Sequence, residues 1–448
     1  MPIFQKDFFV GAATSAHQVE GNNLHSDYWL MENMPHTSFA EPSGDACGHY
    51  KLYQQDIEMM AGAGLNAYRF SIEWARIEPK EGQFDAAETE HYRDVIRCCR
   101  KNGLEPIVTL HHFTSPAWLI RQGGWEAETT PGLFARYARF VAEQLGDELS
   151  YICTINEANM GVQIAAISER YTRQMKAAAV KTAEGNAAEG QVQLGINLQK
   201  TMENRKLAAM ENEQLFGTPQ PNVFCSGRTP RGDELAMEAH RKAKAAIKGA
   251  APHIKVGLTL SLHDIQAQPG GEENAAKEWR EEFTHYLPAI ESDDFLGVQN
   301  YTRSRIGANG ILPNEAGVET TQMDYEFYPQ GLEAVLRRVA LEFHGDLMIT
   351  ENGIATADDT RRIAYIDLAT QGVARCIADG IPVKGYFYWS LLDNFEWQKG
   401  YAMTFGLVAV DRNTMTRTPK ESLRYLGHLR AETCLTKNSS GHNYSQTQ

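Results

Sequence analysis

Short apolar runs alternate with longer amphipathic segments along nearly the whole chain, and this alternation limits the folds that the chain can adopt. Each apolar run can be read as a buried β-strand; the runs are residues 8–12, 67–72, 106–110, 151–155, 255–260, 295–298, 346–350 and 385–388. Helical spacing of apolar residues is found between them, over residues 50–63, 88–101, 131–145, 235–250, 277–287, 330–342 and 363–378. Apolar strands that alternate with helices are typical of a parallel sheet with covered faces.

We therefore predict an α/β protein with a single (β/α)8 TIM barrel over residues 1–435, since no Ser-, Pro- or Gly-rich linker divides the chain. A doubly wound open sheet is the alternative fold, but no GxGxxG motif follows any of the strands. Residues 177–193 are rich in Ala, Glu and Gln and are predicted to form an exposed helical insertion between the fourth and fifth strands. Residues 436–448 are polar and are predicted to be a disordered tail.

Composition excludes several classes of function. The 448 residues carry 43 Lys+Arg and 57 Asp+Glu, a net charge of −14, which suits neither DNA nor RNA as a partner. No window approaches the ~20 apolar residues of a membrane span, and the first residues lack the pattern of a secretory signal. The seven cysteines are scattered without a CxxC motif, which indicates reduced thiols in a cytoplasmic protein and no metal site.

The residues that follow the predicted strands are rich in groups that bind sugars. In a barrel the active site lies at the carboxyl ends of the strands, where this chain places His17, Gln18, Glu20, Arg69, Glu73, His111, His112, Asn156, Glu157, Gln299, Asn300, Tyr301, Glu351, Asn352, Trp389, Asp393, Glu396 and Trp397. Two opposed carboxyl groups among amides, a histidine and indoles suit hydrolysis of a glycosidic bond. Barrels that bind metals also carry carboxylates at strand ends.

Six ordered motifs resemble those of glycoside hydrolase family 1, the β-glucosidase-type retaining enzymes. They are FFVGAATSAHQVEG (8–21), NAYRFSIEWARIEP (66–79), TLHHFTSPAW (109–118), TINE (154–157), ITENG (349–353) and GYFYWSLLDNFEW (385–397), with YAMTFGLVAVD (401–411) after them. The resemblance implies an exo-acting β-glucosidase. Such an enzyme removes terminal non-reducing β-D-glucosyl residues from cello-oligosaccharides and from aryl or alkyl glucosides by double displacement, a step in cellulose degradation, and needs no cofactor.

The resemblance also implies the two catalytic residues. Glu157 in TINE matches the acid/base of the family, and Glu351 in ITENG matches its nucleophile. A retaining mechanism requires these carboxyl groups to lie ~5–5.5 Å apart. At that separation the charge of Glu351 raises the pKa of Glu157, which keeps Glu157 protonated.

Five further residues match groups that bind the sugar hydroxyls. Gln18 and Glu396 correspond to the pair that holds the hydroxyls farthest from the scissile bond. His112 and Asn156 correspond to groups that bind the nearer hydroxyls, and Trp397 to a second hydroxyl contact. The resemblance therefore predicts a complete sugar subsite.

Three other residues are assigned supporting roles by the same resemblance. Tyr301 corresponds to the tyrosine that orients the nucleophile, and Arg69 to the arginine that keeps it ionised. Trp389 corresponds to the sugar platform, and Phe405 is a candidate for the same wall. His111 is expected to point away from the pocket, because adjacent side chains of a strand face opposite sides.

Three other functions compete with this prediction, and the sequence argues against each of them to a different degree. In a 6-phospho-β-glycosidase of the same family, Glu396 would repel the phosphate, and Lys399 is the nearby cation. A metal-dependent barrel hydrolase would use the two histidines and the two glutamates above, but the chain has no HxH or HExxH motif. The third is a catalytically inactive sugar-binding barrel. For the β-glucosidase, the expected partner is a small-molecule β-glycoside substrate, and a homo-oligomer is compatible with the sequence.

The chain departs from the family pattern at a few positions near these motifs. Ala158 stands where a proline is usual, and its backbone is expected to be less constrained. Phe113 and Thr114 replace Trp-Asp, while Gln299 and Asn300 replace Asn-Tyr. None of these positions is one of the two glutamates, so the prediction of the catalytic pair is unaffected.

Overall fold

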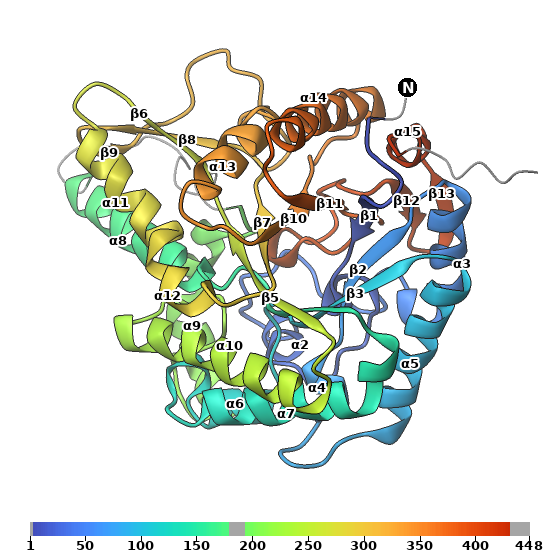
Figure 1. Ribbon diagram of the computed structural model, residues 1–448. Coiled ribbons are helices and arrows are strands. Elements are labelled where there is room, and N and C mark those ends of the chain that lie inside the picture. The colour runs from blue at the N-terminus through green and yellow to red at the C-terminus, as the bar shows by residue number, and fades with distance from the viewer. Residues whose placement is uncertain (1–2, 179–192, 431–448) are drawn as a thin grey trace, which may run out of the picture.

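The computed structural model describes residues 3–178 and 193–430, and eight parallel strands at its centre form a closed barrel (Figure 1). Their order around the barrel is β1-β11-β10-β7-β5-β4-β3-β2. The strands are β1 (Phe9–Ala13), β2 (Ala67–Ser71), β3 (Glu105–His111), β4 (Tyr151–Ile155), β5 (Lys255–Ser261), β7 (Phe295–Gln299), β10 (Asp346–Asn352) and β11 (Val383–Trp389). All eight predicted strands are confirmed, and so is the (β/α)8 barrel.

The barrel closes where the first strand pairs with the last. β1 is parallel to β11, with Phe9 opposite Gly385 and Ala13 opposite Trp389. Gly11 lies at this seam, where a Cβ atom would be only 2.4 Å from the carbonyl oxygen of Ala67. A side chain at Gly11 would therefore push β1 away from β2.

The interior of the barrel is packed with side chains and is not a channel. Buried residues from different strands meet there, including Ala67, Ile107, Cys153, Phe295 and Phe387. These side chains form a floor beneath the carboxyl ends of the strands. The groups that follow the strands are consequently held on a rigid base.

Helices surround the barrel where the sequence predicts them. The seven predicted helices correspond to α3 (His49–Gly62), α5 (Ala86–Lys101), α7 (Thr130–Leu145), α10 (Pro230–Ala250), α11 (Glu272–Glu282), α13 (Gly331–Val339) and α14 (Asp359–Ala378). The prediction over 277–287 is wrong at its carboxyl end. Phe283 leaves the helical conformation with φ −130° and ψ −65°, and the chain continues through η4 (Thr284–Tyr286) and α12 (Leu287–Ile290), where Pro288 begins a new turn.

Several elements outside the barrel are not apparent in the sequence. Two small sheets are formed by β6 (Asp264–Ala267), β8 (Arg303–Gly307) and β9 (Gly310–Ile311), and by β12 (Val408–Asp411) and β13 (Thr416–Pro419). The additional helical segments are α1 (Ala16–Val19), α2 (Asp27–Glu32), α4 (Trp74–Ile77), α6 (Ala117–Arg121), η1 (Gly124–Glu126), η2 (Gly146–Glu148), α8 (Met160–Ala178), α9 (Leu198–Phe216), η5 (Trp397–Lys399) and α15 (Glu421–Gly427). Most extend the loops that connect strands to helices.

The predicted insertion over 177–193 lies mostly outside the described residues, as do the predicted tail over 436–448 and the boundary at 435. The part that is described begins again at Gln193, whose side chain is buried. The expectation of an exposed segment is therefore wrong at Gln193. Its amide forms hydrogen bonds within the barrel rim, which are described below.

The described part of the chain contains no helix that is both long and apolar enough to cross a membrane. Six cysteines in it are free thiols, namely Cys47, Cys98, Cys99, Cys153, Cys225 and Cys376. Burial raises the pKa of the Cys47 thiol to about 12. A thiol in such surroundings behaves as a small apolar side chain.

Candidate active site

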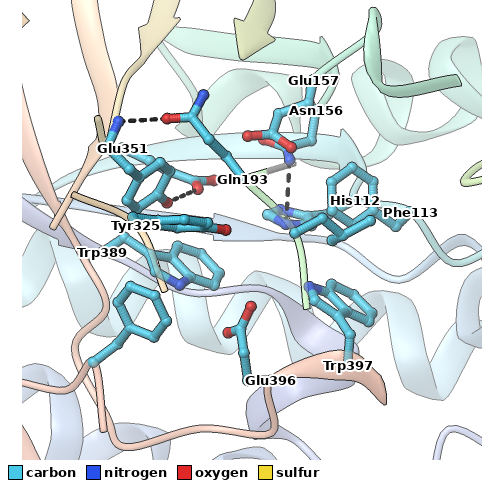
Figure 2. A pocket seen from close by; sticks show the side chains of 13 residues that line it. His112, Phe113, Asn156, Glu157, Gln193, Tyr325, Glu351, Trp389, Glu396 and Trp397 are labelled. Carbon is cyan, nitrogen blue, oxygen red and sulfur yellow. Dashed lines mark hydrogen bonds between the residues drawn. The ribbon is translucent and has the colours of Figure 1, made fainter. Parts of the chain in front are cut away.

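A pocket of about 320 Å³ lies at the carboxyl ends of the barrel strands (Figure 2). It is lined by His112, Phe113, Asn156, Glu157, Gln193, Leu194, Tyr301, Tyr325, Glu351, Trp389, Glu396, Trp397 and Phe405. Most of the residues that the sequence assigns to the site therefore meet in one pocket. Gln18 and Arg69 lie behind this wall and contact its polar groups.

Glu157 and Glu351 reach the pocket through irregular backbone at the ends of β4 and β10. Glu157 has φ 44°, in the left-handed region, and its N–H donates to Thr259 Oγ1 at 2.9 Å. The register of β10 against β7 shifts between Ile349 and Glu351. Such irregularities redirect a side chain, and here they accompany two carboxyl groups that line the same pocket (Figure 2).

Two strong donors surround the carboxyl group of Glu351. Arg69 Nη1 lies 2.6 Å from Glu351 Oε1, and the Tyr301 hydroxyl donates to Glu351 Oε2 at 2.6 Å. The guanidinium of Arg69 is itself fully buried, so its charge is poorly screened. Burial raises the pKa of Glu351, but the charge of Arg69 and the Tyr301 hydrogen bond oppose this rise.

Glu157 lies in a different electrostatic environment. Burial raises the pKa of Glu157 well above its ordinary value, and the charge of Glu351 raises it further. A hydrogen bond from Ser261 and the charge of Arg69 act in the opposite direction. The direct ion pair with Arg69 belongs to Glu351, which favours the ionised form of Glu351 over that of Glu157.

Asn156 connects Arg69 to His112 at the side of the pocket. Its Oδ1 accepts from Arg69 Nη2 at 2.5 Å and from Gln299 Nε2 at 2.8 Å, while its Nδ2 donates to His112 Nε2 at 3.2 Å. Burial and the charge of Arg69 hold the pKa of His112 well below its usual range, so the imidazole is neutral. Since Nε2 accepts, Nδ1 carries the hydrogen, and within the described structure this N–H has no partner.

Glu396 forms the opposite end of the pocket from the catalytic candidates (Figure 2). Gln18 donates through Nε2 to the Phe395 carbonyl at 2.8 Å and to Glu396 Oε2 at 3.4 Å. Burial and the charge of Glu351 raise the pKa of Glu396 to about 8. Sugar hydroxyls that donate to this carboxyl group would favour its ionised form.

Aromatic side chains cover the remaining walls of the pocket. The rings of His112 and Trp389 stack with centroids 5.5 Å apart. Trp397, with φ 47°, stacks on His17 at 5.8 Å with an interplanar angle of 4°. Phe405 lies 6.2 Å from the Tyr301 ring in an edge arrangement.

Two predictions about neighbouring residues can be compared directly with the structure. His111 faces away from the pocket, where its Nε2 lies 3.0 Å from Ser115 Oγ and its ring packs on Trp125, as expected. Ala158 donates its N–H to the Thr259 carbonyl at 3.0 Å. A proline, the residue usual at this position in the family, has no N–H and could not form this bond. The hydrogen bond therefore constrains the backbone at Ala158 in place of the proline ring.

Sequence reasoning did not identify Gln193, Leu194 or Tyr325 as residues of the pocket. Gln193 and Leu194 follow a segment that resembles an exposed helix in composition, and Tyr325 lies in a long loop after β9. None of these three residues directly follows a barrel strand, whereas a position at the end of a strand is what marks most of the predicted site residues. Neither lysine nor arginine lines the pocket, and the described residues hold no cluster of three His, Cys, Asp or Glu suited to a metal ion.

The barrel and its pocket of carboxyl, amide and aromatic groups define a glycoside hydrolase, and comparisons with known proteins agree. The sequence model of the family described as glycosyl hydrolase family 1 matches residues 2–187 and 282–433 of the chain. The chain is 30% identical over 458 residues to a 1,4-beta-D-glucan glucohydrolase of Thermotoga neapolitana, with 94% of this chain and 97% of the relative covered. This protein belongs to glycosyl hydrolase family 1.

A solved structure and a further relative show the same likeness. The beta-glycosidase BGL167 superposes with a TM-score of 0.83 at 44% identity, over 100% of both chains. The 6-phospho-beta-galactosidase of Clostridium acetobutylicum is 28% identical over 470 residues, covering 94% of this chain and 96% of its own.

Proposed function

We propose that this glycoside hydrolase is a retaining, exo-acting β-glucosidase with Glu351 as nucleophile and Glu157 as acid/base. The observation that carries the proposal is the contrast between the two buried carboxyl groups. Glu351 accepts from Arg69 and Tyr301, whereas the pKa of Glu157 is raised well above its ordinary value by burial and by Glu351. One group is therefore ready to attack and the other to donate a proton.

In the first step a Glu351 oxygen forms a bond to the anomeric carbon while the bond from that carbon to the leaving oxygen breaks. Glu157 gives its proton to the leaving oxygen. The ester removes the negative charge of Glu351, which lowers the pKa of Glu157. In the second step Glu157 takes a proton from water, the water oxygen bonds to the anomeric carbon, and the Glu351 carboxylate is released.

The proposed subsite holds one terminal glucosyl residue. Gln18 and Glu396 would bind the hydroxyls at the closed end, and His112 and Asn156 those near the scissile bond. Trp389 would support the apolar face of the ring, with Trp397 as a further hydroxyl contact. A pocket of this kind admits the end of an oligosaccharide and not its middle, which favours cello-oligosaccharides and aryl or alkyl glucosides as substrates and a role in cellulose degradation.

The surroundings in which the protein acts follow from its thiols and charge. Six free cysteines favour the reducing cytoplasm. The net charge of −14 disfavours nucleic acid as a partner. A small-molecule β-glycoside is the partner that this proposal requires.

Retention at the anomeric carbon is the direct test of this function. In an early NMR time course with 4-nitrophenyl β-D-glucoside, β-glucose is expected to appear first and the α-anomer only later, by mutarotation. Two displacements at one carbon restore the original configuration. First appearance of α-glucose would contradict the mechanism, and no glucose at all would favour an inactive sugar-binding barrel.

Glu396→Ser is expected to reduce kcat/KM for neutral β-glucosides by about 10–100-fold, since the variant loses hydrogen bonds to a charged group. The same change should shift substrate preference toward 6-phosphoglucosides, because it removes a carboxyl group that would repel the phosphate. Glu396→Gln keeps the size of the side chain and separates the effect of charge from that of shape. The ratio of kcat/KM for the two substrates is the measurement, and an unchanged ratio would show that Glu396 does not contact the sugar.

A further inference from the structure

Gln193 is a buried pocket residue that comes from the segment between α8 and α9 and not from a strand end (Figure 2). Its side chain is only 7% exposed. Its Oε1 accepts from the main-chain N–H of Tyr301 at 2.6 Å, and its Nε2 donates to Ser261 Oγ at 2.9 Å. Both partners of this amide are themselves partners of the two carboxyl groups described above.

The directions of the two hydrogen bonds made by the Gln193 amide are fixed by their partners. A main-chain N–H can only donate, so the amide oxygen of Gln193 faces Tyr301 and its NH₂ faces Ser261. Ser261 Oγ accepts from that NH₂, so its hydroxyl hydrogen can be donated to the ionised Glu157 carboxylate, whose pKa the Ser261 side chain lowers. On the other side, the Tyr301 hydroxyl donates to Glu351 Oε2.

We propose that Gln193 is a positioning residue for the hydrolytic reaction, which directs the Ser261 hydroxyl toward Glu157 and holds the backbone of the tyrosine that donates to Glu351. The inference rests on the proposed function. Gln193 acts through Ser261 and Tyr301 and is not itself a catalytic residue. Without the Gln193 NH₂, the Ser261 hydroxyl is free to rotate, and Glu157 loses a donor that stabilises its ionised form.

The segment that carries Gln193 is also attached to the rim by contacts that do not involve the carboxyl groups. The N–H of Asn197 donates to Gln398 Oε1 at 2.7 Å, and the N–H of Gln398 donates to the Gly195 carbonyl at 3.1 Å. The side chain of Gln398 therefore offers a matched control. Loss of the Gln398 side chain loosens the segment that carries Gln193 and leaves the contacts of Gln193 to Ser261 and Tyr301 in place.

The experiment compares pH profiles of kcat/KM for an aryl β-glucoside in the wild type and in Gln193→Met, Gln398→Met, Ser261→Ala and the double variant Gln193→Met/Ser261→Ala. The groups that interact electrostatically with Glu157 are unchanged in all of them; they are Arg69, Cys225, Tyr301, Tyr325, Glu351 and Glu396. The fall of kcat/KM at high pH, the basic limb of the profile, reports the loss of the proton from Glu157. Loss of a donor raises the pKa of this group, so the limb moves to higher pH.

Gln193→Met is expected to move the basic limb of the pH profile upward by about half to one pH unit, because Glu157 loses the oriented Ser261 donor. It is expected to lower kcat about tenfold, because the backbone N–H of Tyr301 also loses its acceptor. Gln398→Met should leave the limb in place. In the Ser261→Ala background, Gln193→Met should add no further shift of the basic limb, because the hydroxyl through which Gln193 acts on Glu157 is already absent.

An unmoved limb in Gln193→Met, or an additive shift in the double variant, would overturn the proposal. Gln193→Ala carries the same expectation if the methionine variant does not fold, as judged by circular dichroism. Wild-type protein that does not hydrolyse the glucoside, or that inverts its configuration, would contradict the proposed function and not the role of Gln193. The two failures are therefore distinguishable.

Discussion

Glu351→Gln is expected to reduce kcat for 4-nitrophenyl β-D-glucoside by about 10⁵-fold or more, as loss of a nucleophile does in other enzymes that act through a covalent intermediate. The amide keeps the shape of the side chain but cannot form the glycosyl ester. Steady-state kinetics with freshly purified variant measures the loss. A 2-fluoroglucoside that traps the wild-type enzyme should label Glu351, as identified by peptide mass, and should leave Glu351→Gln unlabelled.

Glu282→Gln is the matched control for this change. Glu282 is also a buried glutamate, and it pairs with His263 at 2.8 Å outside the catalytic pocket. Its variant is expected to retain hydrolysis. In Glu351→Gly, added azide should restore turnover and yield the α-glycosyl azide, since the anion attacks from the face that Glu351 leaves open. Label on another carboxyl group, or a β-azide from this variant, would show that another residue is the nucleophile.

Glu157→Ala is expected to have an effect that depends on the leaving group. For an alkyl glucoside, whose leaving oxygen needs a proton, kcat/KM should fall by about 10³–10⁴-fold, in the range that general acid catalysis contributes. For 2,4-dinitrophenyl β-D-glucoside, whose leaving group needs no proton, kcat/KM should fall by about tenfold or less. Parallel kinetics with the two substrates measure the difference.

The same variant is expected to lose the basic limb of its pH profile. Burial and the charge of Glu351 hold the pKa of Glu157 well above its ordinary value, so wild-type activity is present while Glu157 is protonated and falls as the pH rises through that pKa. With azide present, Glu157→Ala should form the β-glycosyl azide. Equal losses for both leaving groups would assign the proton transfer to another residue.

The barrel was predictable because nearly all residues of its strands are buried, whichever face of the sheet they point to. A run such as Tyr151–Ile155 has no polar residue pointing to solvent, so the sequence itself marks the strand. The small sheet of β6, β8 and β9 lacks this signal. The strand Arg303–Gly307 is only partly buried, and Arg303 pairs with Glu326 beyond the sheet.

Much of the site was predictable for the same reason. Glu351 belongs to a barrel strand and Glu157 lies two residues after the end of one, so strand position and motif agree on both. Arg69 was also identified from its strand, and the structure places it against Glu351. Gln193 and Tyr325 could not be found in this way, because long connections carry them to the rim and only the folded chain brings them there.

The seam between β1 and β11 bears on the order of events during synthesis. β1 gains its second neighbouring strand only when Phe9 pairs with Gly385 in β11. One edge of the nascent sheet therefore stays unpaired until almost all of the chain has been synthesised. An open edge of this kind can pair with another polypeptide. Premature termination anywhere before β11 would thus release a product prone to aggregate, however much of the remaining sequence is intact.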